Sequence, residues 1–94
     1  MAIAVYVENS SVTRAKYEAV MRDLESMGLA APAGRLYHVA MEADDLVRVF
    51  SVWDSRESFD AFSLRLSEAA SEREVNRAGA KREVSEIVNI VVGS

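Results

Sequence analysis

The stretch VFSVWDSRESFDAF, from Val49 to Phe62, contains the transition on which the fold prediction depends. It begins inside an apolar run, residues 46–54, whose β-branched and aromatic side chains are typical of a strand. Asp54 or Ser55 can then cap a helix, with Glu57 in its first turn. The apolar side chains that follow have helical spacing: Phe59, Phe62, Leu66, Ala69 and Ala70. The chain therefore passes here from a strand into a helix.

The residues before this transition predict a second strand. Residues 35–41 again carry apolar and aromatic side chains, and the acidic stretch 42–45 that separates the two runs is typical of a turn. The two strands should therefore pair antiparallel as a hairpin. Neither strand alternates cleanly between apolar and polar residues, so both faces of this hairpin are largely apolar.

The N-terminal third of the chain predicts one strand and one helix. Residues 2–8, AIAVYVE, have the composition of a buried strand. Residues 14–27 predict a helix, with Thr13 as its N-cap and Gly28 just beyond its C-terminus. The single proline lies in residues 30–34 and ends any helix there. One stripe of the helix is apolar: Tyr17, Val20, Met21, Leu24 and Met27.

The C-terminal part predicts a helix break and a last strand. Ser71 to Glu74 (SERE) has the pattern of a capping box, so we expect the second helix to break near Ser71 and to restart as a short polar helix ending at Gly79. The final apolar run, Val84 to Val92 (VSEIVNIVV), predicts the last strand.

The predicted order is β-α-β-β-α-β within a single domain, residues 1–94. This order matches the ferredoxin-like arrangement, an α+β fold in which a four-stranded antiparallel sheet carries both helices on one face. Two helices cover only one face, whereas the hairpin is apolar on both. We therefore expect the chain to form a homodimer through the open sheet face, because exposed apolar patches of this size mark interaction surfaces.

Composition excludes several classes of function. Eleven Lys and Arg against fifteen Asp and Glu give a net charge of −4, without a basic run, so nucleic acid is not an expected partner. The chain has no cysteine and one histidine, which argues against a thiolate or histidine-rich metal site. No apolar stretch is long enough to cross a membrane, and residues 1–8 lack the basic region of a signal peptide. We expect a cytoplasmic protein with no membrane partner.

The junction at Val49 to Phe62 resembles a known pattern: an apolar strand, then Trp, an acidic residue, Ser, two charged residues, and Phe-x-x-Phe. Residues 34–40 and 88–91 are consistent with the same pattern, which belongs to the dimeric α+β barrel superfamily, in particular its antibiotic-biosynthesis-monooxygenase-like branch. The resemblance implies two four-stranded sheets packed face to face.

The members of that superfamily differ widely in activity. They include cofactor-free quinol monooxygenases, haem-degrading enzymes, lactone isomerases, polyketide cyclases and proteins of unproven activity. Haem-degrading members have an Asn on the first strand, a Trp on the second helix and a downstream His. This chain has Phe62 at the Trp position, its single His38 on a strand and Asn9 just past the first strand, which argues against haem degradation.

Candidate site residues follow from the hairpin. If its loop has an even number of residues, His38 shares one face with Val49, Ser51 and Trp53. There His38 would accept a phenolic proton, and Trp53 would stack on an aromatic ligand beside Ser51. The competing interpretation is that His38 is a hydrogen-bonded core or interface residue and that Trp53 only packs.

The opposite face of the hairpin holds Tyr37 and Arg48, two further candidate ligand-binding residues. Arg48 would bind an anionic ligand or pair with Glu86 across the dimer; a peripheral salt bridge is the simpler alternative.

Two functional hypotheses remain open. The first is a barrel that binds a small hydrophobic or aromatic molecule without chemistry. The second is a cofactor-independent monooxygenase of a phenol or quinol, with His38 as the catalytic base. Neither hypothesis requires a metal or an organic cofactor.

Overall fold

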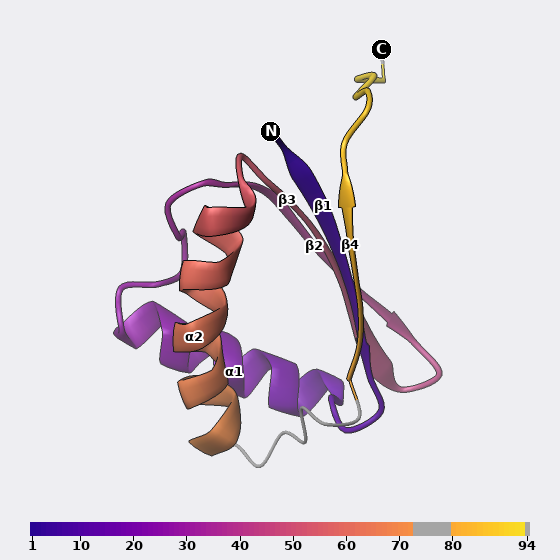
Figure 1. Cartoon of the computed structure of the whole chain (residues 1–94). Coiled ribbons are helices and arrows are strands. Elements are labelled where there is room, and N and C mark those ends of the chain that lie inside the picture. The colour runs from indigo at the N-terminus through magenta and orange to yellow at the C-terminus, as the bar shows by residue number, and fades with distance from the viewer. Residues whose placement is uncertain (73–79, 94) are drawn as a thin grey trace.

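The computed structural model describes residues 1–72 and 80–93 and has the predicted element order (Figure 1). The described strands and helices are β1 (Ile3–Asn9), α1 (Arg14–Ser26), β2 (Arg35–Ala43), β3 (Leu46–Trp53), α2 (Arg56–Glu72) and β4 (Ala80–Glu86).

The four strands form one sheet in the order β2-β3-β1-β4, and every neighbouring pair is antiparallel. Figure 1 shows both helices on the same side of this sheet, so its other face carries no helix. The predicted ferredoxin-like α+β fold is confirmed. Because β2 and β4 are the outermost strands, each borders one side of the space between sheet and helices.

The hairpin turn consists of Asp44 and Asp45 alone, with φ angles of 55° and 64°, and is shorter than the predicted turn over residues 42–45. Positive φ at both positions is characteristic of the tight turn that matches strand twist, and Asp tolerates this conformation. The loop has an even length, and His38 is therefore paired with Ser51. The predicted grouping of His38 with Ser51 and Trp53 on one face is confirmed.

Both helices begin where the sequence predicts. The Thr13 hydroxyl accepts a hydrogen bond from the backbone N–H of Lys16, and the Ser55 hydroxyl accepts one from that of Ser58. Gly28 follows α1 with φ +75°, as expected for a residue that ends a helix. The last described residue of α2 is Glu72, one residue past Ser71, so the predicted break near Ser71 falls at the limit of the described residues and stays a prediction. The predicted short helix that ends at Gly79 lies outside the described residues.

The predicted last strand, Val84 to Val92, is displaced in the structure. β4 is Ala80–Glu86, and the apolar residues 87–93 have no regular structure. The cause is the length of β1: Asn9 pairs with Ala80 and Ile3 with Glu86, and the Ile87 amide still donates to the Ala2 carbonyl. Because the two strands are antiparallel, residues after Ile87 lie beyond the N-terminal end of β1. The most apolar part of the C-terminus therefore has no part of β1 to pair with.

The hydrophobic core lies between the sheet and the two helices. Its buried residues are Ile3, Val5, Val20, Leu24, Trp53, Phe59, Phe62 and Ala69. The opposite sheet face remains accessible, and several of its large apolar side chains are exposed: Tyr37, Val39, Met41 and Phe50. In the part of the chain that the structure describes, no helix is long and apolar enough to cross a bilayer.

Candidate ligand-binding site

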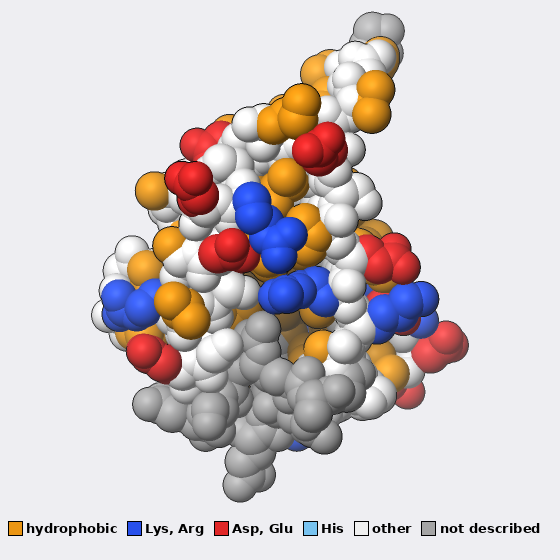
Figure 2. Space-filling model, viewed as in Figure 1, with side chains coloured by type: hydrophobic (Ala, Val, Ile, Leu, Met, Phe, Trp, Pro, Cys, Tyr) orange, Lys and Arg blue, Asp and Glu red, His pale blue; other side chains and the backbone are white. Residues whose placement is uncertain are grey.

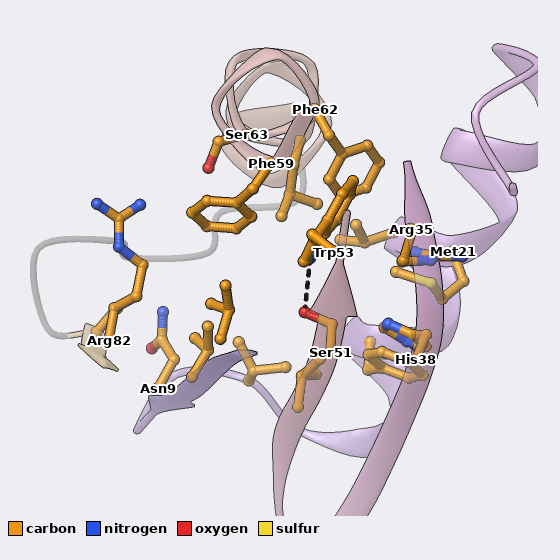
Figure 3. A pocket seen from close by; sticks show the side chains of 18 residues that line it. Asn9, Met21, Arg35, His38, Ser51, Trp53, Phe59, Phe62, Ser63 and Arg82 are labelled. Atoms are coloured by element: carbon orange, nitrogen blue, oxygen red, sulfur yellow. Dashed lines mark hydrogen bonds between the residues drawn. The ribbon is translucent and has the colours of Figure 1, made fainter. Parts of the chain in front are cut away.

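A cavity of about 150 Å³ lies between the sheet and the helical layer (Figure 3). An apolar protein cavity of about this volume holds one benzene molecule, so the space suits a single aromatic ring. Its walls come from β1, β2, β3, α1, α2 and β4, and aliphatic and aromatic side chains form most of them: Val5, Val7, Val12, Val20, Met21, Val49, Trp53, Phe59, Phe62, Leu66 and Ala80.

Three aromatic rings form one wall of the cavity. Trp53, only 1% exposed, ends β3, and its ring centroid lies 5.6 Å from that of Phe59 and 5.4 Å from that of Phe62. Phe59 and Phe62 are three residues apart on α2 and therefore share one helix face. The edge-to-face and tilted packing, with interplanar angles of 66° and 37°, fixes the indole in place.

Ser51 accepts a hydrogen bond from the indole of Trp53 within β3. The Trp53 indole N–H donates a 2.9 Å hydrogen bond to the Ser51 hydroxyl, and both residues are buried (Figure 3). Ser51 lies two residues before Trp53 on the same face of β3. The bond satisfies the only polar atom of the indole, so the ring can form an apolar wall.

His38 lies at one end of the cavity and is bonded to Tyr17 of α1. The Tyr17 hydroxyl oxygen is 2.7 Å from His38 Nε2, and both side chains are half-buried. Burial, followed by the positive charge of Arg35, lowers the pKa of His38. Burial raises the pKa of Tyr17. At neutral pH the pair is therefore an uncharged imidazole and an uncharged phenol that share one hydrogen bond.

A β-bulge places Arg35 at the same end. The register of β2 against β3 shifts between Arg35 and Tyr37, which places Arg35 and His38, three residues apart, on the same sheet face. Arg35 donates a 2.7 Å hydrogen bond to the Ala30 carbonyl, and its guanidinium carbon lies 5.8 Å from the centre of the Phe62 ring. This end of the cavity therefore carries one positive charge beside a neutral base.

The other end of the cavity holds Arg82, Asn9 and Ser63, and Figure 3 shows these three away from His38. The guanidinium carbon of Arg82 lies 5.4 Å from the centre of the Phe59 ring. The Asn9 side-chain oxygen accepts hydrogen bonds from the Ser11 amide, 2.9 Å, and the Ser11 hydroxyl, 2.7 Å. In Figure 2, Lys and Arg side chains border a hollow in which hydrophobic side chains are visible.

Of the candidate residues predicted from the sequence, His38, Ser51 and Trp53 line this cavity together. Tyr37 and Arg48 lie on the opposite sheet face, as the hairpin pattern predicts, and do not reach it. Tyr37 lines a shallow hollow between that face and residues 87–90. Arg48 lies 3.8 Å from Glu8 of the same chain, in an exposed ion pair.

Sequence reasoning missed Tyr17, Arg35 and Arg82. Tyr17 lies in the apolar stripe that the spacing of residues 14–27 predicts, but the sequence does not show the partner of its hydroxyl group, His38 on β2. Arg82 preceded the predicted last strand. Alternate residues of a strand share one face, so Ala80, Arg82 and Val84 lie on the same face of β4. This pattern predicts the face of Arg82 only when the pairing of β4 with β1 is known.

The known proteins that resemble this chain were found by structure alone. No protein-family model and no curated protein matches it. The protein Rv0793 of Mycobacterium tuberculosis has a TM-score of 0.70 at 14% identity, over 98% of this chain and 100% of that one. The monooxygenase ActVA-Orf6 of Streptomyces coelicolor, solved with nanaomycin D, has a TM-score of 0.62 at 16% identity, over 99% and 92%.

A third similar structure is SnoaB, a cofactor-independent oxygenase of Streptomyces nogalater, with a TM-score of 0.62 at 13% identity, over 96% of this chain and 95% of that one. At such identities the likeness concerns the fold. The chain shares the fold of these three proteins, and this is the α+β fold that the resemblance of residues 49–62 implied.

Proposed function

We propose that this protein binds a small monocyclic phenol in the cavity between its sheet and its helices. The observation that carries the proposal is the combination of an aromatic wall with a hydrogen-bonding end. The apolar lining of the cavity, which includes Trp53, offers a surface for a ring, and the His38–Tyr17 pair offers a donor and an acceptor to a hydroxyl group. A volume of about 150 Å³ limits the enclosed part of the ligand to one ring.

The single tryptophan of the chain is the natural probe of this proposal. Because Trp53 forms the cavity wall, a bound ring should change its fluorescence, and calorimetry with phenol, catechol and hydroquinone gives the affinities. The variant Val49→Phe places a ring in the cavity and should abolish binding. Leu64→Phe is the control, since Leu64 is exposed on α2 and does not line the cavity. Absence of binding by the unmodified protein, or equal binding by Val49→Phe, contradicts the proposal.

A second candidate function is cofactor-independent oxygenation of such a phenol or quinol. It is favoured by the neutral imidazole at the cavity end and by the names of two structurally similar proteins. The imidazole would accept the phenolic proton, directly or through the Tyr17 hydroxyl. The electron-rich ring would give two electrons to O₂ as a carbon–oxygen bond forms. Loss of water would leave a ring carbonyl, so one phenol and one O₂ become one quinone and one water.

Oxygen uptake separates the two functions. If the protein is an oxygenase, oxygen consumption with a bound phenol or quinol should match quinone formation one to one. His38→Ala should then lower the rate by about 10²-fold or more, the usual contribution of a general base. If bound compounds cause no oxygen uptake, the oxygenase hypothesis fails and binding alone remains.

We also propose that the protein is a homodimer that associates through its open sheet face. The support is the row of exposed apolar side chains there, with Tyr37 55%, Val39 46% and Phe50 38% exposed. The largely apolar residues 87–90 lie beside this row. Covering this face with a second copy gives the two-sheet barrel that the sequence resemblance implies. Sedimentation at tens of micromolar should give twice the mass of the chain, and a stable monomer contradicts the proposal.

A further inference from the structure

The charged groups that border the cavity all have the same sign. Among its described lining residues are two arginines, Arg35 and Arg82, and no Asp or Glu, although the chain as a whole carries a net charge of −4. Each guanidinium lies over a phenylalanine of α2: Arg35 over Phe62 and Arg82 over Phe59. The aromatic wall is therefore flanked by a positive charge at either end.

The two arginines differ in their hydrogen-bond partners. Arg35 donates a hydrogen bond to the Ala30 carbonyl and lies close to Tyr17 and His38. Within residues 1–72 and 80–93, Arg82 forms neither a hydrogen bond nor an ion pair. Its contact there is the cation–π contact with the Phe59 ring. A stacked guanidinium has its position fixed by the ring while its N–H groups remain directed outward, and these groups bind a carboxylate in a fork.

The position of Arg82 on the sheet matters as well. Arg82 lies on β4, an edge strand, whereas His38 lies on β2, the edge strand at the opposite side of the sheet. Figure 3 shows the aromatic rings between the two ends. A ligand on this wall therefore meets a hydrogen-bonding pair at one end and a positive charge at the other.

We propose that the cavity selects aromatic acids: a single hydroxylated ring whose carboxylate is bound by Arg82 while its hydroxyl group faces His38 and Tyr17. This inference rests on the proposed phenol-binding function and specifies its ligand class. The ring occupies the enclosed space, and the carboxylate lies at the border with solvent, where its desolvation is small. Arg35, the other arginine at the cavity, already donates a hydrogen bond to the Ala30 carbonyl and lies at the His38 end, so we assign the carboxylate to Arg82.

Binding of 4-hydroxybenzoate against its neutral isostere 4-hydroxybenzamide, with phenol as a third probe, tests the inference at pH 7.5. The acid should bind about tenfold or more tightly than the amide, as expected for a hydrogen-bonded charge pair at a partly exposed site. Arg82→Gln should remove this preference and leave the affinity for phenol within about twofold. Lys81→Gln is the matched control: it removes the same charge from the adjacent residue, which faces the other side of β4, and should preserve the preference.

The possible outcomes are distinguishable. If the amide binds as tightly as the acid, the inference is wrong while phenol binding stands. If the preference survives in Arg82→Gln, the assignment to Arg82 is wrong. If none of the three compounds binds, the proposed function fails and the inference fails with it. Arg82→Lys, which keeps the charge and loses the fork, should retain part of the preference and serves if the Gln variant does not fold.

Discussion

The Tyr17 hydroxyl and His38 Nε2 lie 2.7 Å apart, and the two rings are nearly parallel, with 7° between their planes and 6.2 Å between their centroids. This contact joins α1 to β2 at one end of the cavity. Replacing Tyr17 by Phe keeps the ring and removes the bond. We expect a loss of about 1 kcal/mol of unfolding free energy, because the half-buried imidazole nitrogen loses its partner. Thermal denaturation should show a melting point lower by about 4 to 8 °C; an unchanged melting point contradicts a structural role for the bond.

The stability of the protein at mildly acid pH should depend on His38. Burial and the charge of Arg35 lower the pKa of His38 in the folded protein, so the unfolded chain takes up this proton at higher pH than the folded one does. The contribution is present above the unfolded pKa of about 6.5 and is lost as the pH falls through the folded pKa. Urea denaturation from pH 7.5 to pH 5 should show a steeper loss for the unmodified protein than for His38→Gln.

A titration of the single histidine by nuclear magnetic resonance gives the pKa of His38 in the folded protein directly. Arg35→Gln should raise the pKa of His38 toward its ordinary value, since one of the two causes of the shift is removed. A pKa of His38 at or above 6.5 in the unmodified protein would show that the imidazole is not held neutral by its surroundings.

The hydrogen bond between Ser51 and Trp53 should show strong coupling in a double-mutant cycle. Ser51→Ala leaves the buried indole N–H without its acceptor and should cost about 1 to 3 kcal/mol of unfolding free energy. Trp53→Phe costs packing as well. The double variant should lose less than the sum of the two single losses, by about 0.5 kcal/mol or more, because the unsatisfied N–H is absent from it. Chemical denaturation measures all four proteins, and additive losses would show that the bond contributes little.

Gly34 should tolerate no side chain. Its φ is +88°, and a Cβ there would collide with the side chains of Ser58 and Asp54 at the start of α2. Gly34→Ala should cost about 2 kcal/mol or more, the sum of backbone strain and the collision. Gly28→Ala is the control: its φ is +75°, but no atom lies within 4 Å of the added Cβ. That variant should lose only the strain, about 1 kcal/mol. Equal losses in the two variants would show that the collision is relieved by local movement.

Two neighbouring residues of β3 should separate folding from association. Val49 lines the cavity, whereas Phe50 lies on the open face and is 38% exposed. Val49→Arg should lower the unfolding free energy by about 2 kcal/mol or more, because it places a charge in an apolar space. Phe50→Arg should leave the protomer folded and weaken the proposed dimer by about tenfold or more, since large aromatic side chains dominate interfaces. If sedimentation shows Phe50→Arg to be as dimeric as the unmodified protein, the interface lies elsewhere.

The sequence by itself determined the element order and the faces of the hairpin residues from Tyr37 to Trp53. Helical spacing in residues 14–27 and 56–70, caps at Thr13 and Ser55, and two apolar runs joined by an acidic turn are local signals, and the structure has all of them. The pairing of His38 with Ser51 followed from the period of two along a strand and an even turn. Such signals depend on residues close together in the chain.

Only the tertiary structure decided the last strand and the charged part of the site. β4 uses the polar residues 80–86 because β1 offers partners only there, and the more apolar residues 87–93 extend past its end. Arg35 reaches the cavity through a bulge, Arg82 through its register with β1, and Tyr17 through the packing of α1 on the sheet. Each of these depends on contacts between residues far apart in the chain, and hydrophobic periodicity within one segment carries no information about them.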